Sequence, residues 1–230
     1  AHADAIFDEF IASPRSFHYR NKMEYSFSAV SYNAKSDAFE DDFVLGFKKR
    51  GQWLAVESLR ADSGLFDAQM ENFIPKIEHY FKSRGFTAWH SKKNSGFCRM
   101  LAVKKSYAQN SLLLNLVTTS SQLDTFDSQH FTDFVKTELG TRLAGLVHTV
   151  NNDISDRPKA TDGRQNILYG QDFIEEVING LRFKISLESF FQTNPTSAEK
   201  LYQKALDYVF ESSPDQKPVI LDLFSGTGTI

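Results

Sequence analysis

Two glycines near the end of the sequence lie in a pattern that could hold a nucleotide-like ligand. The apolar run 219–223, interrupted by Asp222, is typical of a buried strand of a parallel sheet, and it leads into Ser225-Gly226-Thr227-Gly228-Thr229. Glycine lets the backbone turn sharply and lets a ligand approach it closely. Such a turn at the carboxyl end of a strand commonly seats a nucleotide, but an ordinary strand and turn of an α/β domain would look the same. The stretch lacks the G-x-x-x-x-G-K-[ST] pattern of a phosphate-binding loop.

A second chemical feature is a run of positive charge. Residues 82–105 carry seven cations and no carboxylate. Cations neutralise phosphates, and exposed rings stack on unpaired bases. We therefore predict an RNA-binding surface that uses Lys92, Lys93 and Arg99, with a further basic cluster at 47–53. The alternative is a solvated pair of strands whose rings point into the core. The interleaved rings are Phe86, Trp89 and Phe97.

The composition sets limits on the class of protein. The chain has 230 residues, of which 41% are hydrophobic and 24% charged, as in an ordinary globular protein of one or two domains. Its net charge of −3 argues against a wholly basic nucleic-acid binder. One cysteine, Cys98, allows neither an internal disulfide nor a cysteine metal cluster. No apolar run is long enough to span a membrane, and the first residues lack a signal-peptide pattern. We expect a cytoplasmic protein.

The surrounding pattern predicts a mixture of helices and strands. Strict alternation over 19–30 places Met23, Tyr25 and Phe27 on one face of a strand, with Lys22 and Glu24 on the other. Further strands are predicted over 43–58 (a hairpin turning near Arg50-Gly51), 97–106, 111–120, 145–152, 166–178 and 181–191. Helices are predicted over 66–84 with Pro75 as its start or a kink, over 127–139 ending at Gly140, and from a capping box at 196–199 to about 210. The best candidate for a loop is 153–165.

Four short motifs occur in order along the chain. They are Y-R-N-K-M-E at 19–24, L-Y-G at 168–170, F-F-Q-x-N at 190–194 and L-D-L-F-S-G-T-G-T at 221–229. Together they resemble the RNA 5-methyluridine (uracil-C5) methyltransferases, over essentially the whole chain. The F-F-Q-x-N motif followed at this distance by the glycine turn is specific, whereas either piece alone is weak. Ser225 stands where the family usually has a cysteine.

The resemblance implies an α/β fold with two parts. A mixed α+β central domain that contacts RNA would occupy residues 1–187, and 188–230 would begin a Rossmann-like methyltransferase domain that binds S-adenosylmethionine. Phe190 would lie near a flipped base, where a ring can stack. One of Phe190 and Phe191 would be core, because adjacent strand residues face opposite sides. The cofactor-binding residues implied by the motifs are Gln192, Phe224, Gly226, Gly228 and Thr229.

The resemblance also implies that the reacting groups lie elsewhere. In the family a cysteine thiolate adds to C6 of uracil, S-adenosylmethionine supplies the methyl group to C5, and a glutamate base removes the C5 proton. Both residues would lie beyond residue 230, so no catalytic residue is assigned here, and Cys98 is given no nucleophilic role. We accordingly expect the chain to be a piece of a longer enzyme and to be inactive alone. An iron–sulfur cluster is possible in that longer protein, but its cysteines are not in this sequence.

Substrate and partners are less closely specified. The version of the first motif favours ribosomal RNA over transfer RNA, and the apolar strand at 219–223 could pair with a second copy to make a dimer. No membrane partner is expected. Two other readings remain open: a non-catalytic RNA-binding module, and an unrelated nucleotide-dependent or adenosylmethionine-dependent α/β enzyme.

Overall fold

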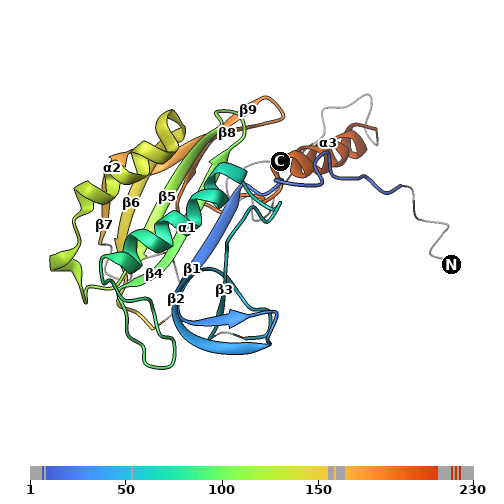
Figure 1. Ribbon diagram of the computed structural model, residues 1–230. Helices are drawn as coiled ribbons and strands as arrows, with labels where there is room; N and C mark the ends of the chain where they lie inside the picture. The colour runs from blue at the N-terminus through green and yellow to red at the C-terminus, as the bar shows by residue number, and fades with distance from the viewer. Residues whose placement is uncertain are drawn as a thin grey trace.

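A large mixed sheet with two helices across one face organises the chain (Figure 1). The computed structural model describes residues 7, 9–52, 54–154, 158, 164–211, 219, 221 and 223. The strands are β1 (Lys22–Asn33), β2 (Ala38–Lys48), β3 (Val56–Ser58), β4 (Cys98–Ser106), β5 (Ser111–Thr118), β6 (Leu143–Val150), β7 (Gln165–Gly170), β8 (Phe173–Ile178) and β9 (Leu181–Ser186). The helices are α1 (Ala68–Ser83), α2 (Ser128–Leu139) and α3 (Pro195–Glu211), with short 3-10 turns η2 (Leu123–Thr125) and η3 (Gly140–Arg142). The prediction of a mixed α/β fold is confirmed.

The seven strands of the main sheet follow the order β2-β3-β1-β4-β5-β6-β7. Most neighbours are antiparallel, but β5 and β6 run parallel because α2 carries the chain back across the sheet between them. The hairpin of β8 and β9 forms a separate two-stranded sheet. β1 and β2 extend past the main sheet and, with β3, form a lobe at one end, which lies at the bottom of Figure 1.

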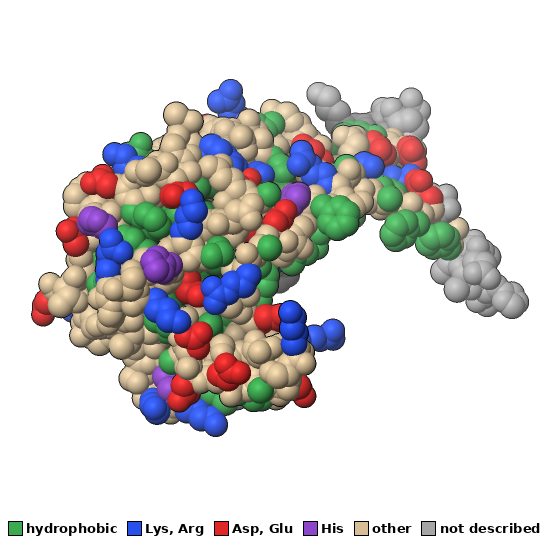
Figure 2. Space-filling model, viewed as in Figure 1, with side chains coloured by type: hydrophobic (Ala, Val, Ile, Leu, Met, Phe, Trp, Pro, Cys, Tyr) green, Lys and Arg blue, Asp and Glu red, His purple; other side chains and the backbone are tan. Residues whose placement is uncertain are grey.

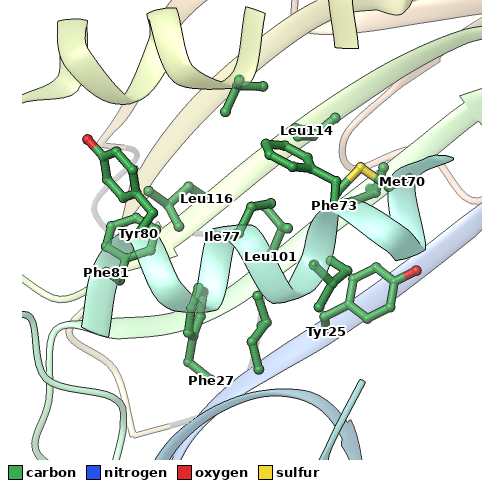
Figure 3. Close-up of a cluster of buried hydrophobic side chains, with 14 of the residues drawn as sticks. Tyr25, Phe27, Met70, Phe73, Ile77, Tyr80, Phe81, Leu101, Leu114 and Leu116 are labelled. Carbon is green, nitrogen blue, oxygen red and sulfur yellow. The ribbon is translucent and has the colours of Figure 1, made fainter. Parts of the chain in front are cut away.

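The main core lies between the sheet and α1 and α2 (Figure 3). Met23, Tyr25 and Phe27 are at most 8% exposed and point toward α1, which confirms the predicted alternation of this strand. From α1, Phe73 and Ile77 pack down onto β4 and β5, because apolar residues three and four apart share one face of a helix.

The helices begin and end close to the predicted positions, with two corrections. Asp67 caps α1 by accepting the Met70 N–H, so Pro75 lies inside this helix and not at its start. The predicted capping box of the last helix is wrong. Asn194 is the cap: its side chain accepts the Ser197 N–H at 3.1 Å, which places a proline at the first helical position, where its missing N–H costs nothing. α2 ends at a glycine with φ +56°, as predicted.

Two predicted strands are divided or shortened in the structure. The segment 166–178 is two strands, because the chain turns at Gly170, which has φ +64°. A Cβ there would lie 2.1 Å from the Ala144 carbonyl oxygen, so only glycine fits. The segment 181–191 stops being a strand at Ser186. The hairpin near Arg50-Gly51 is confirmed, and most of the predicted 153–165 loop lies outside the described residues.

A second, smaller core covers part of the other face of the sheet. It holds the β8–β9 hairpin and the first turns of α3 against β5 and β6 through Leu113, Val147, Ile174, Ile178, Ile185, Phe191, Ala198 and Tyr202. The layers are therefore helices, main sheet, and then the hairpin with α3. The predicted domain boundary at residue 187 stays a prediction.

Candidate functional site

The F-F-Q-x-N motif lies in an irregular segment, Ser186 to Asn194, which we call the strap. Lys104 Nζ holds the start of the strap by donating to the carbonyl oxygens of Ser186 (2.6 Å) and Ser189 (2.8 Å). The Asn21 N–H holds its far end by donating to the Thr193 carbonyl at 2.9 Å. The strap is thus tied to β4 at one end and to the residue before β1 at the other.

The tied strap turns its motif side chains in opposite directions. Phe191 is 8% exposed and lies against the ring of Phe183 in the smaller core, whereas Phe190 is 75% exposed. The prediction that one of the two rings is core is confirmed. Gln192 does not lie on a strand, because β9 has already ended at Ser186. Gln192 is exposed, and its amide forms no hydrogen bond with any other described residue.

Beneath the start of the strap lies a cavity of about 400 Å³, which we call the strap pocket. Strand register builds its floor, since Lys22 pairs with Lys104 across β1 and β4, and Glu24 lies in line with Ala102 and Asn115 of β4 and β5. Directly paired residues project to the same face of a sheet. This is the face turned away from α1 and α2. The lining residues are Lys22, Glu24, Ala102, Lys104, Asn115, Pro158, Gln165, Leu187, Glu188, Ser189 and Phe190.

Lys104 is the most unusual charge in this pocket. Its residue is only 5% exposed, and burial, with a smaller contribution from the Lys22 charge, lowers the pKa of Lys104 to about 8 against the opposing effect of Glu24. Within the described part of the chain, no carboxylate forms an ion pair with Lys104. Glu24 instead pairs with Lys22 at 2.7 Å on the rim. A buried, unpaired ammonium in a cleft marks a candidate functional site.

The predicted RNA-binding cations are separated by the fold. Lys92 and Lys93 are exposed, on the turn before β4. The prediction for Arg99 is wrong: it is 3% exposed, donates to the carbonyls of Asn151 and Asp153, and lies 4.3 Å over the Trp89 ring. Its charge satisfies backbone oxygens at the end of β6 and does not reach the surface.

The rest of the 82–105 region also differs from the predicted surface. Phe86, Trp89 and Phe97 are all at most 8% exposed, so the alternative of rings that point into the core is confirmed. Lys82 pairs with Asp42 and Lys105 with Asp67, carboxylates that are remote in sequence. In Figure 2 cations and carboxylates are interspersed over the face that carries α1 and α2. Of Lys92, Lys93 and Arg99, only the two lysines remain as exposed candidates, and neither has an ion pair with a described residue.

Other sequence expectations meet different outcomes. Phe224, Gly226, Gly228 and Thr229 lie outside the described residues. Cys98 is fully buried, and burial raises the pKa of its thiol, which accords with a structural role. Among the residues that the structure describes, no group of three or more His, Cys, Asp or Glu side chains could hold a metal ion, and no helix is long and apolar enough to cross a membrane.

Sequence reasoning did not single out Lys104 as a site residue. In the sequence Lys104 is one of seven cations of the 82–105 region. The available signal was alternation: the face of β1 opposite Tyr25 carries Lys22 and Glu24, and an antiparallel partner would place its own polar residue beside them. Pairing partners are set by tertiary structure, so this signal could not be used from one strand alone.

Comparison with known proteins agrees with the motifs. No protein-family model matches the chain. An RNA methyltransferase of Clostridium tetani, described as uncharacterized, is 34% identical over 95% of this chain and 45% of its own length. The tRNA (uracil(54)-C(5))-methyltransferase of Pyrococcus horikoshii is 25% identical over 96% of this chain and 46% of its own length. Over nearly its whole length the chain is similar to RNA methyltransferases, among them tRNA uracil-C5 methyltransferases.

A solved structure supports the fold of this chain. The crystal structure of Pyrococcus abyssi tRNA (uracil-54, C5)-methyltransferase in complex with S-adenosyl-L-homocysteine matches with a TM-score of 0.65 and 22% identity. The match covers 96% of this chain and 46% of that one. The chain therefore spans about half the length of the relatives that it matches.

Proposed function

We propose that the natural protein containing this chain methylates C5 of a uridine in RNA, and that the strap forms part of its substrate site. The observation that carries the proposal is the geometry of the F-F-Q-x-N motif. A family motif presents Phe190 at 75% exposure at the strap pocket, while the neighbouring Phe191 anchors the motif in a core. An exposed phenylalanine held on a tied backbone suits stacking on a base removed from its helix.

The cofactor of this reaction is S-adenosylmethionine, which supplies an activated methyl group. Of the predicted cofactor-binding residues, Gln192 is the one that the structure describes. Its amide is exposed and uncommitted, so it can both donate to and accept from a ligand with amino, carboxylate and hydroxyl groups. Phe224, Gly226, Gly228 and Thr229 are proposed to complete the cofactor site, as the motif implies.

The proposed substrate is ribosomal RNA, with transfer RNA as the competing candidate. The preference rests on the first motif. The relatives named as tRNA enzymes are more distant, at 25% identity, than the uncharacterized RNA methyltransferases. Lys92 and Lys93 are proposed to contact RNA phosphates from the turn before β4, since both are exposed.

The experiment is methyl incorporation from labelled S-adenosylmethionine into transcripts of ribosomal and transfer RNA, followed by nucleoside analysis. We expect 5-methyluridine, formed faster in ribosomal RNA. Phe190→Ala and Gln192→Ala should each lower the rate at least tenfold. The matched controls Phe39→Ala and Gln171→Ala, which alter exposed residues of the same types elsewhere, should leave the rate unchanged.

Three outcomes would contradict parts of the proposal. RNA binding without methyl transfer would favour a non-catalytic module. Methylation of a nucleotide other than uridine would favour an unrelated adenosylmethionine-dependent enzyme. Exclusive methylation of transfer RNA would overturn only the choice of substrate.

A further inference from the structure

Lys104 has one hydrogen-bond donor that the protein does not use. An ammonium carries three N–H groups, and two of them are bound by Ser186 and Ser189. No other described residue accepts the third, and the side chain forms part of the strap-pocket wall. The third N–H can therefore donate to a ligand that enters the strap pocket.

A buried charge in this position calls for an oxygen ligand. Taking an ammonium out of water without a counter-ion is unfavourable, and neutral carbonyls compensate for it only in part. The charged groups around Lys104 are Lys22 and Glu24 from β1, Glu176 from β8 and Glu188 from the strap. Lys105, the next residue on β4, pairs with Asp67 on the other face of the sheet. Of these carboxylates, Glu24 is engaged by Lys22, and Glu176 accepts the N–H groups of Tyr107 and Ala108.

The other walls suit a flat aromatic ring with polar edges. Phe190 offers an exposed ring at the mouth, and Ala102 leaves the floor open because its side chain is small. Asn115 is 1% exposed and fixed by Thr149 (2.8 Å) and Pro158 (3.2 Å). A cavity of about 400 Å³ lies within the usual range for a single small ligand.

We propose that the strap pocket binds one unpaired nucleotide of the RNA, with the third N–H of Lys104 donating to one of its oxygens, either of phosphate or of a base carbonyl. Phe190 stacks on the base. The inference rests on the proposed function for the identity of its partner, and it adds Lys104 to the residues that contact RNA.

The test is a titration of Lys104 with and without RNA. In protein with isotope-labelled lysine, NMR follows the ionisation of this side chain, whose signal is assigned by its loss in Lys104→Arg. Without RNA we expect a pKa of about 8. A saturating short oligouridylate should raise the pKa by about one unit or more, because a ligand that accepts from the ammonium binds the charged form about tenfold more tightly. An unchanged pKa would overturn the proposal, since a residue that only holds the strap would not respond to RNA.

Variants provide a second readout. Lys104→Met should weaken oligouridylate binding about tenfold or more, and Lys104→Arg should retain most of it. The control Lys35→Met, at an exposed site on the β1–β2 turn, should change binding much less. If Lys104→Met fails to fold, the titration of the unmodified protein still decides. S-adenosylhomocysteine should not raise the pKa of Lys104. A rise with that ligand but not with RNA would assign the pocket to the cofactor and overturn the proposal.

The two proposals fail separately. Uridine methylation by the natural protein, together with a Lys104 pKa that RNA does not change, would refute nucleotide binding in the strap pocket and leave the proposed function standing. A rise in the Lys104 pKa with RNA, without any methyl transfer by the natural protein, would refute the proposed function and leave the nucleotide site standing.

Discussion

The buried imidazole of His148 should make the stability of the fold depend on acid. His148 is 3% exposed on β6, with Nε2 2.9 Å from Thr118 Oγ1 and its ring packed edge-on against Phe126 at 5.0 Å. Burial lowers its pKa from 6.5 to about 4. Below about pH 6.5 the unfolded chain therefore binds more protons than the folded chain. The contribution of the neutral imidazole to the free energy of unfolding is complete above that pH and is lost as the pH falls toward 4.

The size of the effect follows from the two pKa values. Between about pH 7.5 and 4.5, the free energy of unfolding should fall by about 2.5 kcal/mol through His148 alone. Other groups also titrate in this range, so the assay compares variants. Urea unfolding at both pH values is measured for the unmodified chain and for His148→Gln, in which an amide can still bond Thr118 without taking up a proton.

We expect His148→Gln to lose about 2.5 kcal/mol less than the unmodified chain between the two pH values. The control His79→Gln, at an exposed position of α1, should follow the unmodified chain. An equal loss in the unmodified chain and in His148→Gln would refute the reasoning, because the imidazole would then take up its proton as readily in the folded state as in the unfolded state.

Three further predictions concern the RNA surface, the strap and the fold. Reversing Lys92 and Lys93 to Glu should weaken RNA binding several-fold and flatten its salt dependence in fluorescence anisotropy; no change would make this turn a merely solvated surface. Gln192→Ala should lower cofactor affinity or turnover at least tenfold while the melting temperature stays within a few degrees; early melting with normal turnover would make Gln192 structural. Asp67→Asn keeps the cap of α1 but removes the charge that pairs with two cations, so urea unfolding should show a loss of about 2 to 4 kcal/mol; a loss below about 1 kcal/mol would contradict a buried ion-pair network.

Local patterns predicted most elements of the fold. Alternation located β1, and Gly140 marked the end of α2, because those signals depend only on neighbouring residues. The end of β9 is not predicted because 181–191 reads as one strand of alternating apolar and polar residues, whereas its last residues leave the sheet to bury Phe191 in a separate core. That choice depends on β5, β6 and α3, which are remote along the chain.

The site was predicted less completely than the fold. The motif identified Phe190 and Gln192 as outward residues, and one neighbouring ring as core. Counting charge along 82–105 failed, since it could not show that Arg99 would bond carbonyls at the end of β6 or that Lys105 would meet Asp67. Lys104 needed the register of β1 with β4 before its place beside Lys22 was visible.

We propose that this chain takes part in methyl transfer to C5 of uridine in RNA. Replacing the C5 hydrogen by a methyl group must release that hydrogen, so the most direct measurement is tritium release from RNA labelled at C5 of its uridines. With the natural protein and S-adenosylmethionine, we predict release of one tritium for each methyl group incorporated, and a rate at least tenfold lower in Phe190→Ala. Methyl incorporation without tritium release would place the methyl group on another atom and contradict the proposed function.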